Sequence, residues 1–167
     1  NDEDSDGSNL PTVDANSVTS DVVATRLLFQ TQPAPLTVLT GVQMDFTADP
    51  VVRAVDANGV TDTGYATSIV LAEVNGAGSA TMTVIGDQDA SAATVTITPI
   101  SGAATFSNLQ LTYTNSTVTS DETFNLRASS GGLTTADSSQ FTSLGLPSIT
   151  SAAYDAGTGT LMVTGTN

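Results

Sequence analysis

The sequence contains no cysteine, no histidine, no tryptophan and no lysine. Without cysteine it can form no disulfide framework, and without histidine or cysteine the common zinc sites, Ser-His-Asp triads and thiol centres are excluded. Without lysine it has neither a Schiff-base nucleophile nor a Walker-type phosphate loop. Aromatic residues make up only 5% of the chain, which leaves little material for a hydrolase cleft around paired carboxylates. We therefore expect a protein that is not an enzyme.

Positive charge is also nearly absent. The chain has 3 basic residues, all arginine, against 17 acidic ones, and its formal net charge is −14. Nucleic acids and anionic membranes both need a basic surface, so this balance argues against either as a partner. No apolar run approaches the roughly 18 residues of a membrane-spanning helix, and we expect no membrane insertion.

What the sequence does contain is a long series of short alternating segments. Residues 1–23 are acidic and polar, which is typical of a linker or an extended N-terminal segment. From residue 24 to residue 143, runs of strand length are separated by Gly, Asn, Asp and Ser clusters. Phe124, Leu126 and Ala128 alternate with polar residues, and this period of two predicts one buried and one solvated face. About eight such strands predict an all-β fold, an antiparallel β-sandwich.

Two irregularities interrupt the alternation. Pro50 breaks the long run around VQMDFTADPVVRAV, and we expect either a bulge or a strand that crosses from one sheet to the other. The apolar parity also slips between Phe106 and Leu109, which predicts a bulge or kink at Ser107 and Asn108.

The last part of the chain, residues 144–167, is predicted to be a connector followed by a hairpin around Ala156-Gly157-Thr158-Gly159. Because a lone hairpin is marginal in water, it needs a partner. It packs on the sandwich, begins a second module, or pairs with a strand of a neighbouring subunit. We expect the chain to be part of something longer.

The order of several segments resembles the Ig-like repeats of large bacterial surface proteins and adhesins. These segments are LLFQTQP, VVRAVDANG, GAATFSNLQL and ETFNLRASSGGLTTADSSQF, and they cover roughly residues 25–143. The tail PSITSAAYDAGTGTLMVTGTN resembles the opening of another such repeat. The resemblance implies an Ig-like antiparallel β-sandwich outside the cell, at the cell surface, within a stalk, adhesin or filament.

The turn in VRAVDANGVTDTG contains the main candidate metal ligands. Asp56, Asn58 and Asp62 offer the carboxylate and amide oxygens that Ca²⁺ prefers. Alternatively, Asn58-Gly59 is the turn itself and Asp56 caps it through its own side chain. We favour the turn and keep calcium as the alternative.

A second calcium candidate lies in DEDSDG at the start of the chain. Asp2, Asp4 and Asp6 match the opening of a D-x-D-x-D-G calcium loop, but Leu10 and Val13 occupy the ninth and twelfth positions, where ligands are needed. A solvated acidic linker is the favoured interpretation. Asp87 and Asp89 form a further acidic turn with the same ambiguity.

The hypothesis that accounts for most of these observations is a non-enzymatic structural or adhesive module. We expect it to assemble with neighbouring modules or identical subunits through its terminal segments, and to contact a surface glycan or protein. The alternative is a calcium-assisted carbohydrate-binding module, in which Tyr65, Tyr113 and Tyr154 would form a platform for sugar rings. Ordinary strand and rim positions are the favoured interpretation of these tyrosines.

Overall fold

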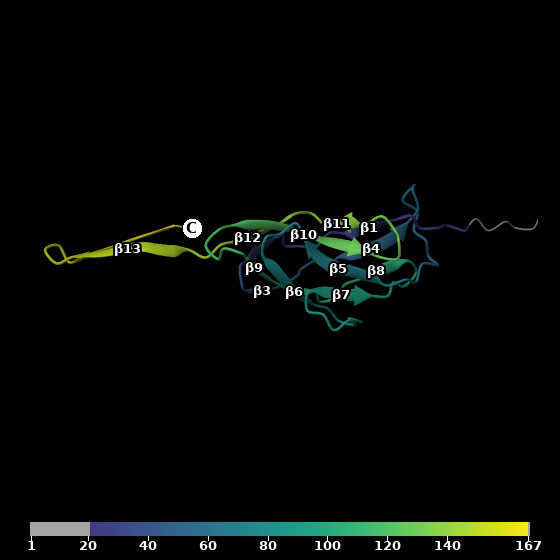
Figure 1. Cartoon of the computed structure of the whole chain (residues 1–167), viewed down its shortest axis with the longest axis horizontal. Coiled ribbons are helices and arrows are strands. Elements are labelled where there is room, and N and C mark those ends of the chain that lie inside the picture. The colour runs from purple at the N-terminus through teal and green to yellow at the C-terminus, as the bar shows by residue number, and fades with distance from the viewer. Residues whose placement is uncertain (1–20, 167) are drawn as a thin grey trace, which may run out of the picture.

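A computed structural model describes residues 21–166, and within that range it contains strands and no helix. Strands β1–β12 form a β-sandwich of two layers, and β13 and β14 form a separate hairpin. This confirms the all-β, largely antiparallel sandwich that the alternation predicts. The first described residues and the hairpin lie at opposite ends of an elongated molecule (Figure 1). None of the described residues belongs to a helix that could span a membrane.

The first layer consists of two three-stranded sheets, with the orders β1–β4–β8 and β3–β9–β6. Every pairing in them is antiparallel. The strands are β1 (Arg26–Thr31), β3 (Gln43–Asp45), β4 (Val51–Val55), β6 (Ser79–Thr83), β8 (Ala103–Thr105) and β9 (Gln110–Thr114).

The second layer is one sheet with the order β2–β12–β10–β5–β7, in which β11 also pairs with β10. The strands are β2 (Thr37–Leu39), β5 (Ile69–Val74), β7 (Thr94–Ile97), β10 (Glu122–Ser129), β11 (Ala136–Asp137) and β12 (Phe141–Leu144). Only β2 and β12 run parallel to each other. The start of the chain thus contributes β1 to the first layer and β2 to the second.

The chain bends between the two sheets of the first layer, where the sequence breaks its pattern. Residues 46–50 separate β3 from β4, and residues 106–109 separate β8 from β9. The Asp49 carboxylate joins the two bends, because it accepts hydrogen bonds from the backbone N–H groups of Asn108 (2.9 Å) and Leu109 (3.3 Å). Asn108 has a φ of +51°, in the left-handed region that asparagine tolerates. At Pro50, where the sequence predicts a bulge or a crossing between sheets, the chain passes from the β3–β9–β6 sheet to the β1–β4–β8 sheet of the same layer. The chain also bends at Ser107 and Asn108, where a bulge or kink is predicted.

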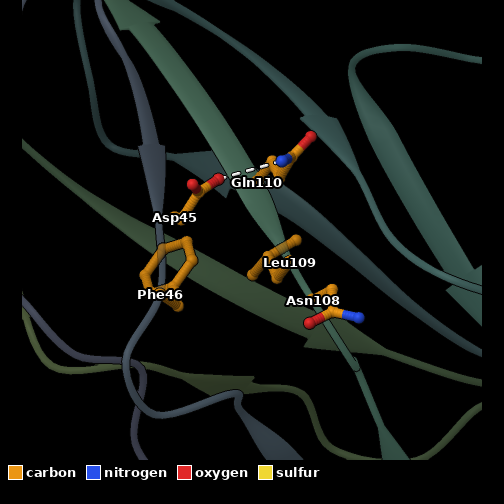
Figure 2. Close-up of a pocket in the computed structure, with 5 residues that line it drawn as sticks. All are labelled: Asp45, Phe46, Asn108, Leu109 and Gln110. Atoms are coloured by element: carbon orange, nitrogen blue, oxygen red, sulfur yellow. Dashed lines mark hydrogen bonds between the residues drawn. The ribbon is translucent and has the colours of Figure 1, made fainter.

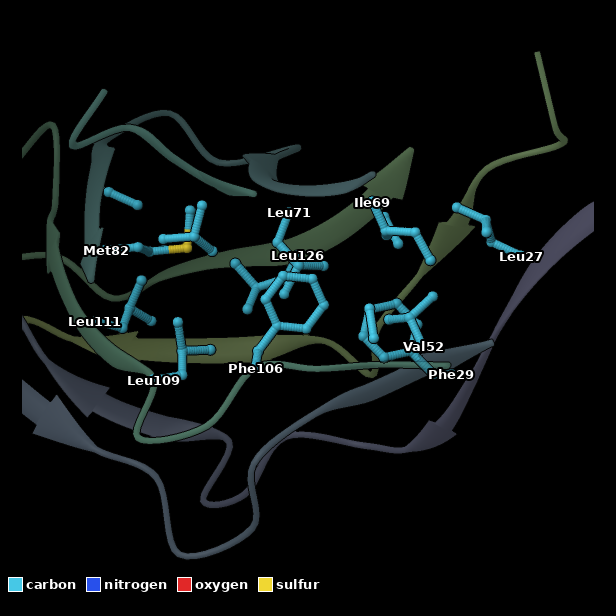
Figure 3. Packing of buried hydrophobic residues seen from close by; sticks show 14 of the residues in the cluster. Leu27, Phe29, Val52, Ile69, Leu71, Met82, Phe106, Leu109, Leu111 and Leu126 are labelled. Carbon is cyan, nitrogen blue, oxygen red and sulfur yellow. The ribbon is translucent and has the colours of Figure 1, made fainter. Parts of the chain in front are cut away.

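The core lies between the layers. On β10, Phe124, Leu126 and Ala128 are fully buried and the residues between them face outward, as the alternation predicts. Figure 3 shows Leu71 and Leu126 of the second layer meeting Phe106 of the first. Each large side chain buried in this way stabilises the fold by about 1.5–3 kcal/mol.

The hairpin of β13 (Ser148–Asp155) and β14 (Thr160–Thr166) contributes no residue to this core. The connector before it is held by two hydrogen bonds, from the Leu146 N–H to the Val118 carbonyl (2.6 Å) and from the Gly145 N–H to the Asp121 carboxylate (2.8 Å). Figure 1 shows β13 projecting from the end of the sandwich where β9 and β12 lie. The sandwich therefore completes its core without the hairpin.

Candidate functional site

The predicted metal ligands Asp56 and Asn58 lie in a tight turn after β4. Asp56 Oδ1 accepts hydrogen bonds from the backbone N–H groups of Asn58 (2.9 Å) and Val60 (2.8 Å). The Gly59 N–H donates to the Asp56 carbonyl (3.1 Å), and Gly59 has a φ of +88°. Glycine adopts that conformation without steric cost, so the Asn58-Gly59 pair makes the turn possible.

Asp62 lies at the same end of the sandwich, and its carboxylate accepts hydrogen bonds from two other backbone N–H groups. Its Oδ2 accepts a hydrogen bond from the Ala24 N–H (3.1 Å), which ties the start of the described chain to this loop. Its Oδ1 accepts from the Gly64 N–H (2.9 Å). Asp62 thus caps its own turn, as Asp56 does.

These contacts favour the turn interpretation over a calcium site. A cation would have to compete with backbone N–H groups that already point at the oxygens of Asp56 and Asp62. The Arg26 guanidinium also lies beside the turn, since a Cβ added at Gly59 would stand 3.7 Å from Arg26 Nη2. Within residues 21–166 there is no group of three or more carboxylates placed to hold a metal ion.

Two other acidic segments were predicted as possible calcium sites, and the structure describes only the second of them. Asp2, Asp4 and Asp6 lie outside the described residues. In the third acidic turn, Asp89 accepts hydrogen bonds from the Thr96 hydroxyl (2.6 Å) and the Ser91 N–H (2.8 Å). The hydrogen bond from Thr96, followed by that from Ser91, holds the pKa of Asp89 below its usual value. This turn also satisfies its own carboxylate.

A shallow pocket lies where the two sheets of the first layer bend. Figure 2 shows Asp45, Phe46, Asn108, Leu109 and Gln110 around it. Gln110 Nε2 donates a hydrogen bond to Asp45 Oδ1 (2.9 Å) across its rim. The Phe46 ring packs edge-on against the Phe141 ring at 5.9 Å between centroids, so it is engaged with the core. The pocket offers polar rim groups and no open aromatic face for a sugar.

The three tyrosines do not form a platform. Tyr113 is fully buried, and its hydroxyl accepts from the Gly78 N–H (2.9 Å) and donates to Glu122 Oε2 (3.1 Å). Burial raises the pKa of Tyr113 to about 12, and the Glu122 carboxylate adds to the effect. The Tyr65 hydroxyl bonds to Ser130 Oγ (2.7 Å), while Tyr154 is exposed on the hairpin. Because one ring is in the core and another is on a separate element, the sugar-stacking arrangement has no geometric support.

The hairpin is the least covered element of the described chain. Residues directly opposite each other in an antiparallel pair share a face, so the register sorts the side chains into two sets. One face, which we call the apolar hairpin face, consists of Ile149, Ala152, Tyr154, Leu161 and Val163. The other face is mostly serine and threonine. All of these side chains are exposed except Ser148, which is half-buried.

The apolar hairpin face could have been found from the sequence. Leu161 and Val163 share one parity with Met162 between them, and Tyr154 and Ala152 share one parity in the preceding strand with Ala153 between them. Sequence reasoning identified the hairpin but assigned no residues to its contact face. The signal was the period of two, which requires that one face be covered.

The chain was compared with known proteins by a scan of protein-family models and a search of curated proteins, and neither found a match.

Proposed function

We propose that this chain is a non-enzymatic, Ig-like structural or adhesive module of a bacterial surface stalk or filament, which assembles through its terminal segments. The observation that carries this proposal is the β13–β14 hairpin, which projects from a sandwich whose core is complete without it. An uncovered hairpin is marginal in water and gains stability only from a partner. The element therefore supports a role in contact with another module or subunit.

The strand order supports the Ig-like part of the proposal. An Ig sandwich places strands A, B, E and D in one layer and strands C, F and G in the other. Here β1, β4, β8–β9 and β6 follow the order A-B-E-D, and β5, β10 and β12 follow the order C-F-G. β7 adds one strand beside β5. The quoted segments that resemble bacterial surface repeats support the extracellular placement.

The position of the chain ends supports a load-bearing role. The described chain begins at one end of the sandwich and leaves it at the other, so tension would run along its length (Figure 1). Near the exit, β2 pairs in parallel with β12 through Thr37–Leu39 and Thr142–Leu144. Force along these strands would load their hydrogen bonds together in shear, since the bonds lie across the pulling direction.

The test compares residues 1–167 with a variant that lacks residues 147–167. Because the hairpin contributes nothing to the core, the shortened chain is expected to keep its melting temperature. Sedimentation velocity and negative-stain imaging should show association of the full chain and a compact monomer for the shortened one. Equal association of both chains, or monomers in both cases, would contradict the proposed assembly.

A further inference from the structure

We propose that the loop between β6 and β7 prevents β7 from pairing edge to edge with a second copy of this chain, and that this protection depends on the carboxylate of Asp87. We call residues 86–93 the covering loop. The inference is separate from the proposed assembly through the terminal segments, because it concerns a different edge of the sandwich. The position of β7, its sequence and the hydrogen bonds of the covering loop support it.

β7 is an edge strand. It is the last strand in the order β2–β12–β10–β5–β7, and Figure 1 shows it along the lower margin of the sandwich. The edge strands β2, β3 and β8 have three residues each, and strands that short give a second chain little to pair with. β7 has four residues, and its alternation continues to Thr98. An edge of this kind invites pairing with another chain unless it is covered or charged.

The sequence around β7 favours such pairing. Residues 92–98 read AATVTIT, a run of seven residues with no charge, no proline and no glycine. Uncharged segments of about this length with high β-propensity are the ones that form intermolecular sheets. The run is also self-complementary, because an antiparallel pair centred on Thr96 places threonine opposite threonine and a β-branched apolar residue opposite another. Two copies related by a twofold axis would therefore present matching side chains to each other.

The covering loop occupies the free edge of β7. The Thr96 N–H donates a hydrogen bond to Asp87 Oδ1 (2.8 Å), and the Thr96 carbonyl accepts one from the Gln88 N–H (3.0 Å). The Thr94 N–H donates to the Ser91 carbonyl (3.3 Å). Successive residues of an antiparallel strand alternate between its two sides, so β7 presents no further N–H group on this edge. A strand from another chain would have to displace these hydrogen bonds.

The covering loop is held in place from both layers. Asp89 Oδ2 accepts hydrogen bonds from the hydroxyls of Thr94 (3.2 Å) and Thr96 (2.6 Å). On the other side, the Ala92 carbonyl accepts from the Met82 N–H (2.7 Å) of β6, which is an edge strand of the first layer. The loop therefore bonds to the free edges of both β6 and β7.

Asp87 connects the covering loop directly to the strand. Its Oδ1 accepts from the Thr96 N–H in β7 and from the Asp89 N–H (3.2 Å) in the loop, so one oxygen closes the loop and covers the strand. It also places a negative charge at the edge, where a second copy would bring an identical charge beside it. Alanine at this position would remove the acceptor and the charge, whereas asparagine would remove only the charge.

The first experiment compares Asp87→Ala with Asp56→Ala in the full chain. Asp56 Oδ1 also accepts hydrogen bonds from two backbone N–H groups, but both donors belong to the turn itself and not to a strand edge. The two variants are therefore matched in lost charge and in lost turn acceptor. Thioflavin fluorescence and sedimentation velocity should show intermolecular sheet forming about tenfold faster or more for Asp87→Ala, because its edge is open. Asp56→Ala should behave as the parent chain does, and Asp87→Asn should lie between the two.

The second experiment locates the change by amide hydrogen exchange in dilute, monomeric samples. The Thr96 N–H should exchange about tenfold faster in Asp87→Ala than in the parent chain, because it loses its acceptor and faces solvent. The Val95 N–H, on the side of β5, should keep its protection in both chains.

The third experiment adds a proline to the open edge. Thr96→Pro removes the outward N–H at an edge position, where proline is tolerated. Its effect on the hydrogen bonds between β7 and β5 should be small, since this N–H does not face β5. Combined with Asp87→Ala, it should return the rate of intermolecular sheet formation to that of Asp56→Ala.

Each contrary result overturns the inference. Equal rates for Asp87→Ala and Asp56→Ala would show that the covering loop does not protect β7. Unchanged exchange at Thr96 would show that Asp87 does not cover this edge, and rapid association of the double variant would place the contact elsewhere. These results leave the proposed assembly untouched, because that assembly is tested by removal of residues 147–167 from chains that retain Asp87.

Discussion

The substitution Phe124→Ala tests whether the sandwich is one cooperative unit built around its aromatic stack. Phe124 is fully buried on β10. Its ring stacks on Tyr113 at 4.1 Å and on Phe141 at 4.8 Å between centroids, with interplanar angles of 4° and 7°. Removing it leaves a cavity between two rings that belong to different strands.

The expected magnitude follows from these contacts. A buried Phe→Ala substitution costs about 3–5 kcal/mol, and the two lost stacking pairs favour the upper part of that range. For a chain of this size, each kcal/mol lowers the melting temperature by about 2–4 °C. We therefore expect a decrease of about 10–15 °C in thermal unfolding followed by far-ultraviolet circular dichroism. Phe124→Leu keeps more of the apolar volume but loses both stacked ring pairs, each worth about 0.5–1.5 kcal/mol; it should cost less than Phe124→Ala and gives a measurable result if the alanine variant does not fold.

The matched control is Tyr154→Ala on the hairpin. It also removes an aromatic ring, but one that is 67% exposed and outside the core, so its effect should lie within about 0.5 kcal/mol. The measurement belongs at protein concentrations below the onset of association. A comparable loss for Tyr154→Ala would show that the hairpin packs on the sandwich, and a decrease of less than about 4 °C for Phe124→Ala would refute the role assigned to the stack.

Three further predictions concern the charged loops. Asp56→Ala should lower the free energy of unfolding in urea by about 0.5–1.5 kcal/mol, because the backbone N–H groups of Asn58 and Val60 lose their acceptor. Asp45→Ala, which frees only a side-chain amide, should cost less, and equal costs would contradict the role of Asp56 in the turn. The hydrogen bond from Arg127 (2.6 Å) holds the pKa of Asp137 below its usual 3.8. A depressed folded-state pKa contributes stability above the unfolded value that is lost as the pH falls through the folded value, so Asp137→Asn should reduce the loss of stability in acid. Ca²⁺ followed by chelator should leave the melting temperature unchanged, whereas a clear increase with Ca²⁺ would identify the acidic turns as ligands.

Much of the fold could be predicted because it depends on local patterns. The alternation of Phe124, Leu126 and Ala128 determines which side of β10 is buried, whatever that strand pairs with. The bends at Pro50 and Asn108 could be predicted for the same reason, since a proline and a shift in parity interrupt any ladder. The carboxylate of Asp49, which joins the two bends, could not be assigned, because its partners lie far away in the sequence.

The sequence says less about which strands pair with each other. Nothing in the TVL segment of β2 indicates a parallel partner at the other end of the chain, in β12. The choice depends on which edge is open once the other strands have paired.

The candidate calcium residues show that an acidic composition alone does not identify a metal site. Most of the acidic residues in the described chain accept hydrogen bonds from backbone N–H groups of turns and loops. These residues are Asp49, Asp56, Asp62, Glu73, Asp87, Asp89, Asp121, Glu122 and Asp155. In the described part of the chain, these carboxylates therefore stabilise the turns and loops that connect the strands.

Two opposing effects decide whether these carboxylates stabilise the protein: the hydrogen bonds that they accept, and the repulsion between their charges. Each hydrogen bond that such a carboxylate accepts contributes about 0.5–1.5 kcal/mol net. Exposed charges that are further apart than the Debye length of about 8 Å are largely screened from one another at physiological salt. For a single carboxylate in residues 21–166, the hydrogen bonds that it accepts therefore outweigh the repulsion from carboxylates in other loops. The repulsion acts mainly between whole molecules. Between Ser138 and Thr166 the sequence carries one charged residue, Asp155, so this stretch itself adds little to that repulsion.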